Sequence, residues 1–267
     1  MSAITDHEFG LFQRLIYKLA GINLSTEKKV LLVGRLQRRL REYGLETFAE
    51  YYRLLASGEH PEEVQTMVDL LTTNETYFFR EPKHFDFLRE EVLLRHPRSE
   101  PFRIWSAASS TGEEAYTMSM VLAETLGNAP WEVVGTDIST QVLAKARAAH
   151  YPLGRHEGIP PKFLSKYCLK GVRSQEGTFL VVPELRQRVR FEHANLTRPI
   201  TADVGRFDVI FLRNVMIYFD QETKRKVVEH LVFHLKPKGY FVVGHSETLN
   251  GIADYLRLLR PTIYQKE

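Results

Sequence analysis

The sequence predicts an α/β protein in which a doubly wound, Rossmann-like domain follows an all-α N-terminal domain. Residues 6–72 show helical periodicity of apolar side chains and no strand signal. Residues 102–116 pass from a short apolar run, through a run of small residues, into a second helical pattern. A further apolar run then ends at Asp137. Strands that alternate with helices in this way are typical of a parallel sheet covered by helices.

Length and composition indicate a globular protein with a sizeable core. The chain has 267 residues, of which 43% are hydrophobic and 26% charged, and its formal net charge is +3. This charge is too small to indicate nucleic-acid binding by itself. The single cysteine, Cys168, excludes an internal disulfide and a cysteine-rich zinc site, and we expect no metal. The N-terminus shows no signal peptide, and no apolar stretch reaches membrane-spanning length. We therefore expect a soluble, cytoplasmic protein that does not insert into membranes.

Four helices are expected in the N-terminal domain, which we place at residues 1–75. The first ends at Gly21, and the second is capped by Ser25 or Thr26. An aromatic and leucine-rich third helix follows, and the fourth begins at or just after Pro61.

The second of these helices has an unusual charge distribution. Between positions 28 and 41 there are six cations and no acid. The cations are Lys28, Lys29, Arg35, Arg38, Arg39 and Arg41. Arg35, Arg38 and Arg39 fall on a face opposite the leucines, so we expect them to point outward. A solvated helix face normally mixes both signs of charge, which makes an acidic partner surface the favoured interpretation.

Residues 72–81 are polar, then aromatic, then basic. Such a segment is typical of a crossing between domains or of the lining of a site. Pro82 is expected to start another helix.

The loop Ser106–Gly112 joins a strand at Phe102–Trp105 to a helix that opens with Glu113 and Glu114. Small side chains let a backbone approach a ligand closely, as in nucleotide-binding loops. Only one glycine is present, so the dinucleotide fingerprint is absent. The two acids disfavour a phosphate and favour a ligand that carries positive charge. The alternative is a tight turn in which the acids only stabilise the helix dipole.

Asp137 ends the second strand, 25 positions after Gly112 (137 − 112). Nucleotide-binding α/β folds place the carboxylate that binds ribose hydroxyls at about this spacing. The spacing favours ribose binding over the alternative of a helix-capping aspartate.

The remaining pattern is a small excursion followed by the last strands of the sheet. Glycines and prolines interrupt residues 151–190. Thr178–Val182 and Val189–Phe191 resemble short strands, which we assign to a β-subdomain at about 153–192. Phe207–Leu212 is a buried strand, and ligands bind at the carboxyl ends of such strands. Closing strands are expected at Tyr240–Gly244 and Thr262–Gln265.

Taken together, these features resemble the CheR family, the S-adenosylmethionine-dependent glutamate methyltransferases of bacterial chemotaxis receptors. The resemblance spans nearly the whole chain. It rests on Thr72–Arg80, Trp105–Ala107, Ser110–Glu114, Asp137, Asn195–Leu196, Phe207–Phe211, Arg213–Phe219 and Gly244–Glu247.

The resemblance implies a methyltransferase domain at residues 76–267, with S-adenosylmethionine as the cofactor and S-adenosylhomocysteine as the product. Glu114 would contact the ammonium of the cofactor and Asp137 its ribose. The residues implied around the rest of the cofactor are Asn74, Thr76, Arg80, Asn195, Leu196, Leu212 and Arg213. Arg80 and Tyr218 would flank the transferable methyl group and the incoming carboxylate.

The resemblance also implies a substrate, a partner and a mechanism. Glutamate is already an ionised nucleophile near neutral pH, so methyl transfer requires no general base. The partner would be the cytoplasmic signalling domain of methyl-accepting chemotaxis receptors, docked on Arg35, Arg38 and Arg39. We expect a monomer that binds no nucleic acid.

Three alternatives compete with this interpretation. An esterase is rejected because three adjacent residues, His245–Glu247, cannot form a triad and no Gly-x-Ser-x-Gly elbow is present. A nucleic-acid methyltransferase would suit the basic helix, but the strand end at Arg213–Val215 lacks the prolines typical of enzymes that methylate exocyclic amines. A catalytically silent cofactor-binding module remains the third alternative.

Overall fold

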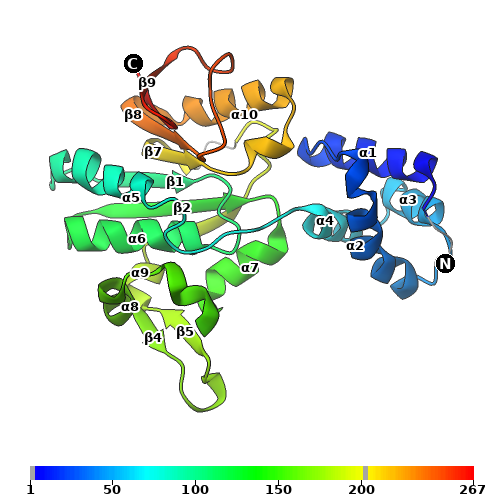
Figure 1. The fold of residues 1–267 in the computed structure, drawn as a ribbon, viewed down its shortest axis with the longest axis horizontal. Helices are drawn as coiled ribbons and strands as arrows, with labels where there is room; N and C mark the ends of the chain where they lie inside the picture. The colour runs from blue at the N-terminus through cyan, green and yellow to red at the C-terminus, as the bar shows by residue number, and fades with distance from the viewer. Residues whose placement is uncertain (1–3, 201–203) are drawn as a thin grey trace.

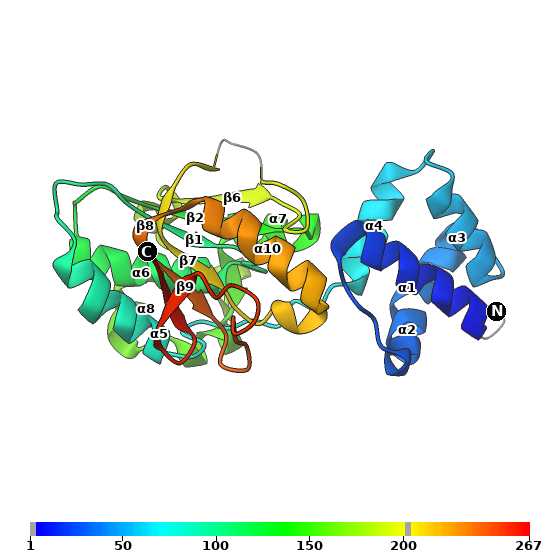
Figure 2. The same ribbon diagram turned by 90° about the horizontal axis from the view of Figure 1, so that it is seen from above.

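The computed structural model describes residues 4–200 and 204–267. The first three residues of the expected helical domain therefore lie outside the described residues. A helical N-terminal part lies beside a larger sheet-containing part, and residues 72–82 cross between them (Figures 1 and 2).

The four helices expected in the N-terminal part are confirmed: α1 (Asp6–Ala20), α2 (Lys29–Glu42), α3 (Phe48–Ala56) and α4 (Pro61–Leu71). Their apolar faces meet in one core around Phe12, Leu36, Tyr51 and Met67, each fully buried. The expected cap of the second helix is displaced, because a 3-10 turn at Thr26–Lys28 precedes α2.

Only one of the three arginines expected to point outward from α2 does so freely. Arg38 has an 81% exposed side chain and pairs with Glu42. Arg39, in contrast, pairs with Glu63 of α4, whose side chain is 2% exposed. The Arg35 guanidinium donates to the carbonyls of Leu70 and Thr72 at 3.1 and 2.9 Å.

The prediction for Arg35 and Arg39 was therefore wrong: Arg35 binds backbone carbonyls at the end of α4, and Arg39 binds a buried acid. Glu63 faces α2 from α4, and a buried carboxylate requires a charged or hydrogen-bonding partner. Arg39 and the hydroxyl of Tyr51, which donates to Glu63 at 2.5 Å, provide these partners. As a result the pKa of Glu63 lies below its ordinary value despite burial.

The main sheet has seven strands in the order β6-β2-β1-β7-β8-β10-β9. The first five are parallel: β6 (Val189–His193), β2 (Trp131–Asp137), β1 (Phe102–Ser106), β7 (Phe207–Leu212) and β8 (Leu235–Val243). The antiparallel edge consists of β10 (Ile263–Lys266) and β9 (Leu256–Arg260). Both expected closing strands are present, whereas β9 was not predicted.

Helices cover both faces of this sheet, which confirms the doubly wound α/β prediction. Ile104 and Val133 lie in a core with α5 (Lys83–Phe87), α6 (Glu113–Leu126) and α7 (Thr140–Ala148). Their strand neighbours Trp105 and Val134 lie in a second core with α10 (Gln221–Phe233). Successive side chains of a strand point to opposite faces, so each of these buried strands contributes side chains to both cores.

A small three-stranded sheet projects from this domain, in the order β3-β5-β4 (Figure 1). Its strands are β3 (His150–Pro152), β5 (Thr178–Val181) and β4 (Cys168–Lys170), accompanied by α8 (Pro161–Tyr167) and α9 (Pro183–Arg186). The strand expected at Thr178–Val182 belongs here. The strand expected at Val189–Phe191 does not: it is β6, which pairs in parallel with β2 at the edge of the main sheet. The β-subdomain therefore ends before position 189.

Short turns complete the element list. A π turn at Leu88–Val92 continues α5, and 3-10 turns lie at Leu93–Arg95, Leu153–Gly158, Arg173–Gln175 and Met216–Tyr218. Within residues 4–200 and 204–267, no helix combines the length and apolarity needed to cross a membrane.

Candidate active site

A cavity of about 340 Å³ lies between the N-terminal helices and the carboxyl ends of β1, β2 and β7. Its position agrees with the rule that open α/β sheets bind ligands beyond the carboxyl ends of their strands. Nine of the ten predicted catalytic and cofactor-binding residues line it. They are Asn74, Thr76, Arg80, Glu114, Asp137, Asn195, Leu196, Arg213 and Tyr218.

Leu212 is the exception. Its side chain is fully buried in the core with α10 and is absent from the cavity wall. It follows Phe211, which faces the opposite core, so strand alternation directs Leu212 toward α10. Leu212 was expected among the residues around the cofactor, but it does not line this cavity.

The loop after β1 is shaped by Asp137 and by one glycine. Gly112 has φ 96°, and a Cβ atom there would lie 3.0 Å from both the Ala146 Cβ and the Tyr151 hydroxyl. Only glycine fits such a position without strain. The two Asp137 oxygens accept hydrogen bonds from the backbone N–H groups of Ser110 at 2.9 Å and Ser139 at 3.0 Å.

Asp137 is not the residue that caps the following helix. The N-cap of α7 is Ser139, whose hydroxyl accepts from the Val142 N–H. Burial raises the pKa of Asp137 above its ordinary value, although the surrounding N–H groups favour the ionised form. A buried carboxylate that lines a cavity fits a ligand-binding role better than the capping alternative.

The two acids that open α6 face different surroundings. Glu114 lines the cavity, accepts a hydrogen bond from the Ser106 hydroxyl at 2.6 Å and lies 3.1 Å from the Arg213 Nη1. Glu113 is absent from the cavity wall and accepts from the Thr111 hydroxyl at 2.6 Å. Burial raises the pKa of both carboxyl groups. Of these two acids, Glu114 is therefore the one placed to meet a cationic ligand in this cavity.

The interdomain segment reaches the cavity through a tightly turned backbone. Phe79 and Glu81 have φ values of 56° and 57°, a conformation that non-glycine residues rarely adopt. Between them, the Arg80 guanidinium donates to the Glu75 carbonyl at 2.9 Å and lies over the Tyr77 ring. Backbone strain of this kind is concentrated at functional sites.

The opposite wall ties the two domains together. The Asn195 side-chain amide donates to the Leu19 carbonyl at 2.6 Å, and the Tyr218 carbonyl accepts from the Asn23 N–H at 2.9 Å. Asn195 and Tyr218 therefore join the α/β domain to residues around the end of α1, which encloses the cavity.

Two acids beside the cavity were not singled out from the sequence. Glu81 pairs with Arg213 at 3.0 Å, and Glu247 accepts from the backbone N–H groups of Asn214, Met216 and Gly244, each at 2.8 Å. Both lie within the motifs quoted above or next to them. Its position directly after Arg80 is the sequence signal that could have identified Glu81.

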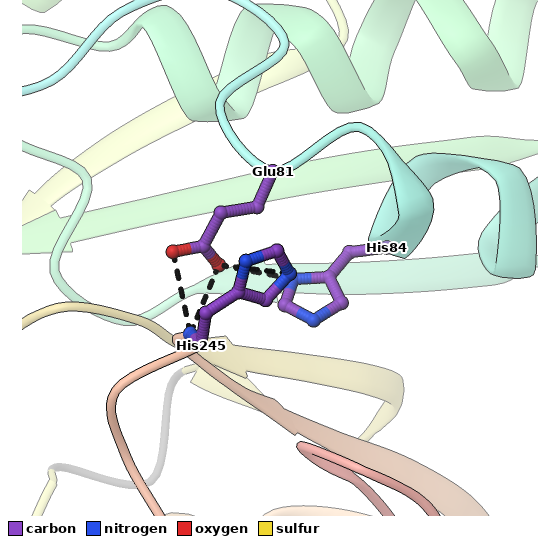
Figure 3. A group of neighbouring side chains, drawn as sticks. All are labelled: Glu81, His84 and His245. Carbon is purple, nitrogen blue, oxygen red and sulfur yellow. Dashed lines mark hydrogen bonds and ion pairs between the residues drawn. The ribbon is translucent and has the colours of Figure 1, made fainter.

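Glu81 also lies against two histidines (Figure 3). The side-chain ligand atoms of Glu81, His84 and His245 are all within 4.8 Å of one another, a grouping that could hold a metal ion. Arg213 already donates to Glu81, however, and a divalent cation would have to share the carboxylate with this guanidinium. Burial and Arg213 lower the pKa of His84 to about 3, so His84 is neutral near pH 7. The group is better described as part of an ion-pair network.

Comparisons with known proteins agree with this architecture. The family model for the CheR methyltransferase, SAM binding domain, matches residues 74–264, and that for the CheR methyltransferase, all-alpha domain, matches residues 7–72. The chain is 42% identical over 264 residues to a chemotaxis protein methyltransferase of Escherichia coli (strain K12), covering 98% of this chain and 91% of that protein. It is 42% identical over 262 residues to chemotaxis protein methyltransferase 2 of Pseudomonas aeruginosa, covering 97% and 93%. A chemotaxis protein methyltransferase of Borreliella burgdorferi is 36% identical over 273 residues, covering 98% and 95%.

Proposed function

The chain belongs to the CheR methyltransferase family, and on this premise we propose that it methylates glutamate side chains of chemotaxis receptors, giving methyl esters. It is an S-adenosylmethionine-dependent methyltransferase, as the matched SAM-binding domain and the named relatives show. The observation that carries the finer proposal is the cavity in which Arg80, Glu114, Asp137 and Tyr218 meet.

The residues of this cavity fit the proposed cofactor. Glu114 offers a carboxylate to the cofactor's ammonium: its Oε1 accepts from the Ser106 hydroxyl, and its Oε2 forms an ion pair with Arg213 at 3.1 Å. Asp137 offers a carboxylate to the ribose, and Leu196 offers an apolar surface to the adenine. Asn74, Thr76 and Arg80 line the cavity from the interdomain segment and would cover the amino-acid end.

For this reaction the protein has to position the reactants and exclude water, and it does not have to supply a base. The cofactor supplies a methyl group on a positively charged sulfur. A glutamate carboxylate is ionised at neutral pH and can attack without losing a proton. Arg80 would hold this carboxylate, Tyr218 would orient it, and the N-terminal helices would exclude water. No general base is therefore needed.

The receptor would dock on the exposed part of the basic helix. The outward cations are Lys28, Arg38 and Arg41, whereas Arg35 and Arg39 hold α2 on α4. The proposed partner is the cytoplasmic signalling domain of a methyl-accepting receptor, which places the enzyme in the cytoplasm. We propose that it acts as a monomer and does not bind nucleic acid.

Transfer of labelled methyl groups tests the substrate class. The purified protein and labelled S-adenosylmethionine are incubated with a receptor signalling fragment, with duplex DNA or with RNA. Label in the receptor alone supports the proposal. Label in DNA or RNA would replace it with the nucleic-acid alternative, and label in none of them would indicate a silent cofactor-binding module.

Charge reversal on α2 should slow receptor methylation without affecting cofactor binding. In Arg38→Glu/Arg41→Glu we expect several-fold slower methylation at low salt and a weaker salt dependence, because exposed charges act mainly on encounter and are screened over about 8 Å. Arg39 is left intact because its replacement would leave the buried Glu63 carboxylate without its ion-pair partner. The matched control is Arg89→Glu/Arg95→Glu, which reverses two exposed arginines beyond α5. Equal salt curves for both double variants would exclude this docking surface.

Cofactor affinity should fall as the pH is lowered. Burial raises the pKa of Glu114, and the cofactor's ammonium binds only the ionised carboxylate. Affinity is therefore full above this raised pKa and declines as the pH falls through it, at a higher pH than for an ordinary glutamate with a pKa of about 4.3. Calorimetric titration with S-adenosylhomocysteine from about pH 5 to 8 measures this effect. Glu114→Gln should flatten the profile. An unchanged profile in this variant would assign the titration to another group, such as Asp137.

A further inference from the structure

Arg213 lies between two acids, and it donates hydrogen bonds to only one of them. Its side chain is 1% exposed, and those of Glu81 and Glu114 are 12% and 13% exposed. The guanidinium donates to Glu81 through Nη2 at 3.0 Å and Nε at 3.3 Å, and to the Arg80 carbonyl at 2.5 Å. Toward Glu114, Nη1 forms an ion pair at 3.1 Å that is not aligned as a hydrogen bond, and Nη1 has no hydrogen-bond partner in the described parts of the chain.

Charge counting shows why this inequality matters. Arg213 with Glu114 alone would be a neutral buried pair, and a neutral pair attracts a cationic ligand weakly. With Glu81 included, the three groups carry a net charge of −1 when both carboxyl groups are ionised. The Arg80 guanidinium also favours the ionised form of Glu114, but its own hydrogen bond goes to the Glu75 carbonyl. Because the hydrogen bonds of Arg213 go to Glu81, the excess negative charge lies on Glu114, which faces the cavity.

The surroundings of Glu81 favour its ionised form. The Asn214 amide and the His245 backbone N–H also donate to its carboxylate, each at 3.3 Å. Burial opposes ionisation, but these donors and Arg213 bring the pKa of Glu81 below its ordinary value. Burial raises the pKa of Glu114 instead, and the nearby charge of Glu81 adds to this rise. The Glu81 backbone is left-handed, with φ 57°, a conformation that non-glycine residues rarely adopt.

We propose that Glu81 is a positioning residue that engages Arg213 and thereby leaves the Glu114 carboxylate free to select a ligand with an ammonium group. The inference rests on the proposed contact between Glu114 and the cofactor's ammonium. Glu81 itself does not line the cavity. Its contribution is the charge that offsets Arg213, together with the position of the Arg80 carbonyl that Arg213 binds.

Two ligands and two variants separate this role from a merely structural one. The ligands are S-adenosylhomocysteine and its deamino analogue, in which hydrogen replaces the amino group. Binding of both is measured by calorimetry to wild type, Glu81→Gln and Glu114→Gln, with Glu90→Gln as the control that removes an exposed acid from the adjoining turn. In Glu81→Gln we expect roughly tenfold weaker binding of S-adenosylhomocysteine and nearly unchanged binding of the deamino analogue.

Each other result has a defined meaning. Equal losses for both ligands in Glu81→Gln would show that Glu81 only maintains the structure, and would overturn the inference. No loss in Glu81→Gln together with a selective loss in Glu114→Gln would overturn the inference and leave the proposed role of Glu114 intact. If Glu114→Gln shows no selective loss of S-adenosylhomocysteine binding, the proposed contact between Glu114 and the ammonium is itself wrong.

A crystal structure of the wild-type complex with S-adenosylhomocysteine provides an independent test if Glu81→Gln does not fold. We expect Arg213 to keep its hydrogen bonds to Glu81 while Glu114 binds the ammonium. Transfer of the Arg213 hydrogen bonds from Glu81 to Glu114 in the complex would contradict the inference.

Discussion

Replacing Arg80 with alanine is expected to lower kcat/KM for receptor methylation by roughly 10²–10³-fold, the usual cost of removing a preorganised charged donor from a reacting centre. Arg80 lines the cavity next to a strained backbone, and its guanidinium is held by the Glu75 carbonyl and the Tyr77 ring. A fixed planar guanidinium can orient a carboxylate for in-line attack, which a flexible or absent side chain cannot.

The measurement is initial-rate methylation of a receptor fragment, with the affinity for S-adenosylhomocysteine determined separately on the same preparation. A loss confined to cofactor affinity would limit Arg80 to cofactor binding. Arg89→Ala is the control, because the Arg89 side chain is 46% exposed and pairs with the exposed acids Asp86 and Glu90. Wild-type kcat/KM in Arg80→Ala would remove Arg80 from the reacting centre.

Replacing Asp137 with alanine should weaken S-adenosylhomocysteine binding by about 1–3 kcal/mol, the cost of losing hydrogen bonds to a charged group. Asp137 also accepts from the N–H groups of Ser110 and Ser139, so the variant will lose some stability as well. Affinity alone therefore does not isolate the ribose contact, and thermal unfolding of the ligand-free variant has to be measured beside it.

Ligand variation isolates the ribose contact. Wild type should bind 5′-methylthioadenosine more tightly than its 2′-deoxy analogue, and Asp137→Ala should reduce this preference. If the preference is the same in wild type and variant, Asp137 shapes only the loop and the ribose must be bound by other groups. Asp69→Ala is a suitable control, because Asp69 is a nearby acid that binds Thr140 and does not line the cavity.

The features predicted well from the sequence are those encoded locally. Strands that alternate with helices, the small-residue loop and the acid at the end of β2 predicted that Glu114 and Asp137 lie at one edge of a parallel sheet. The structure brings both residues to one cavity. Parallel strands meet at their carboxyl ends whatever the details of packing, so this inference required no knowledge of side-chain contacts.

The features that were missed depend on partners distant in the chain. The pairing of Arg39 with Glu63 joins two helices whose relative rotation no periodicity reveals, and it reversed the expected orientation of that arginine. Arg213 was assigned to the cavity wall, but its binding to Glu81 depends on a left-handed backbone in another segment. β6 was assigned to the wrong sheet because a five-residue strand carries no information about its neighbour.

The bond formed on the substrate tests the central claim most directly. A receptor signalling fragment is incubated with the enzyme and S-adenosylmethionine carrying a labelled methyl group, and the modified peptides are identified by mass spectrometry. The account predicts label on glutamate side chains, released as methanol by mild base, and lost when those glutamates are replaced by alanine. Label that resists base, or that lies on another residue type, would contradict the proposal that this cavity forms glutamate methyl esters.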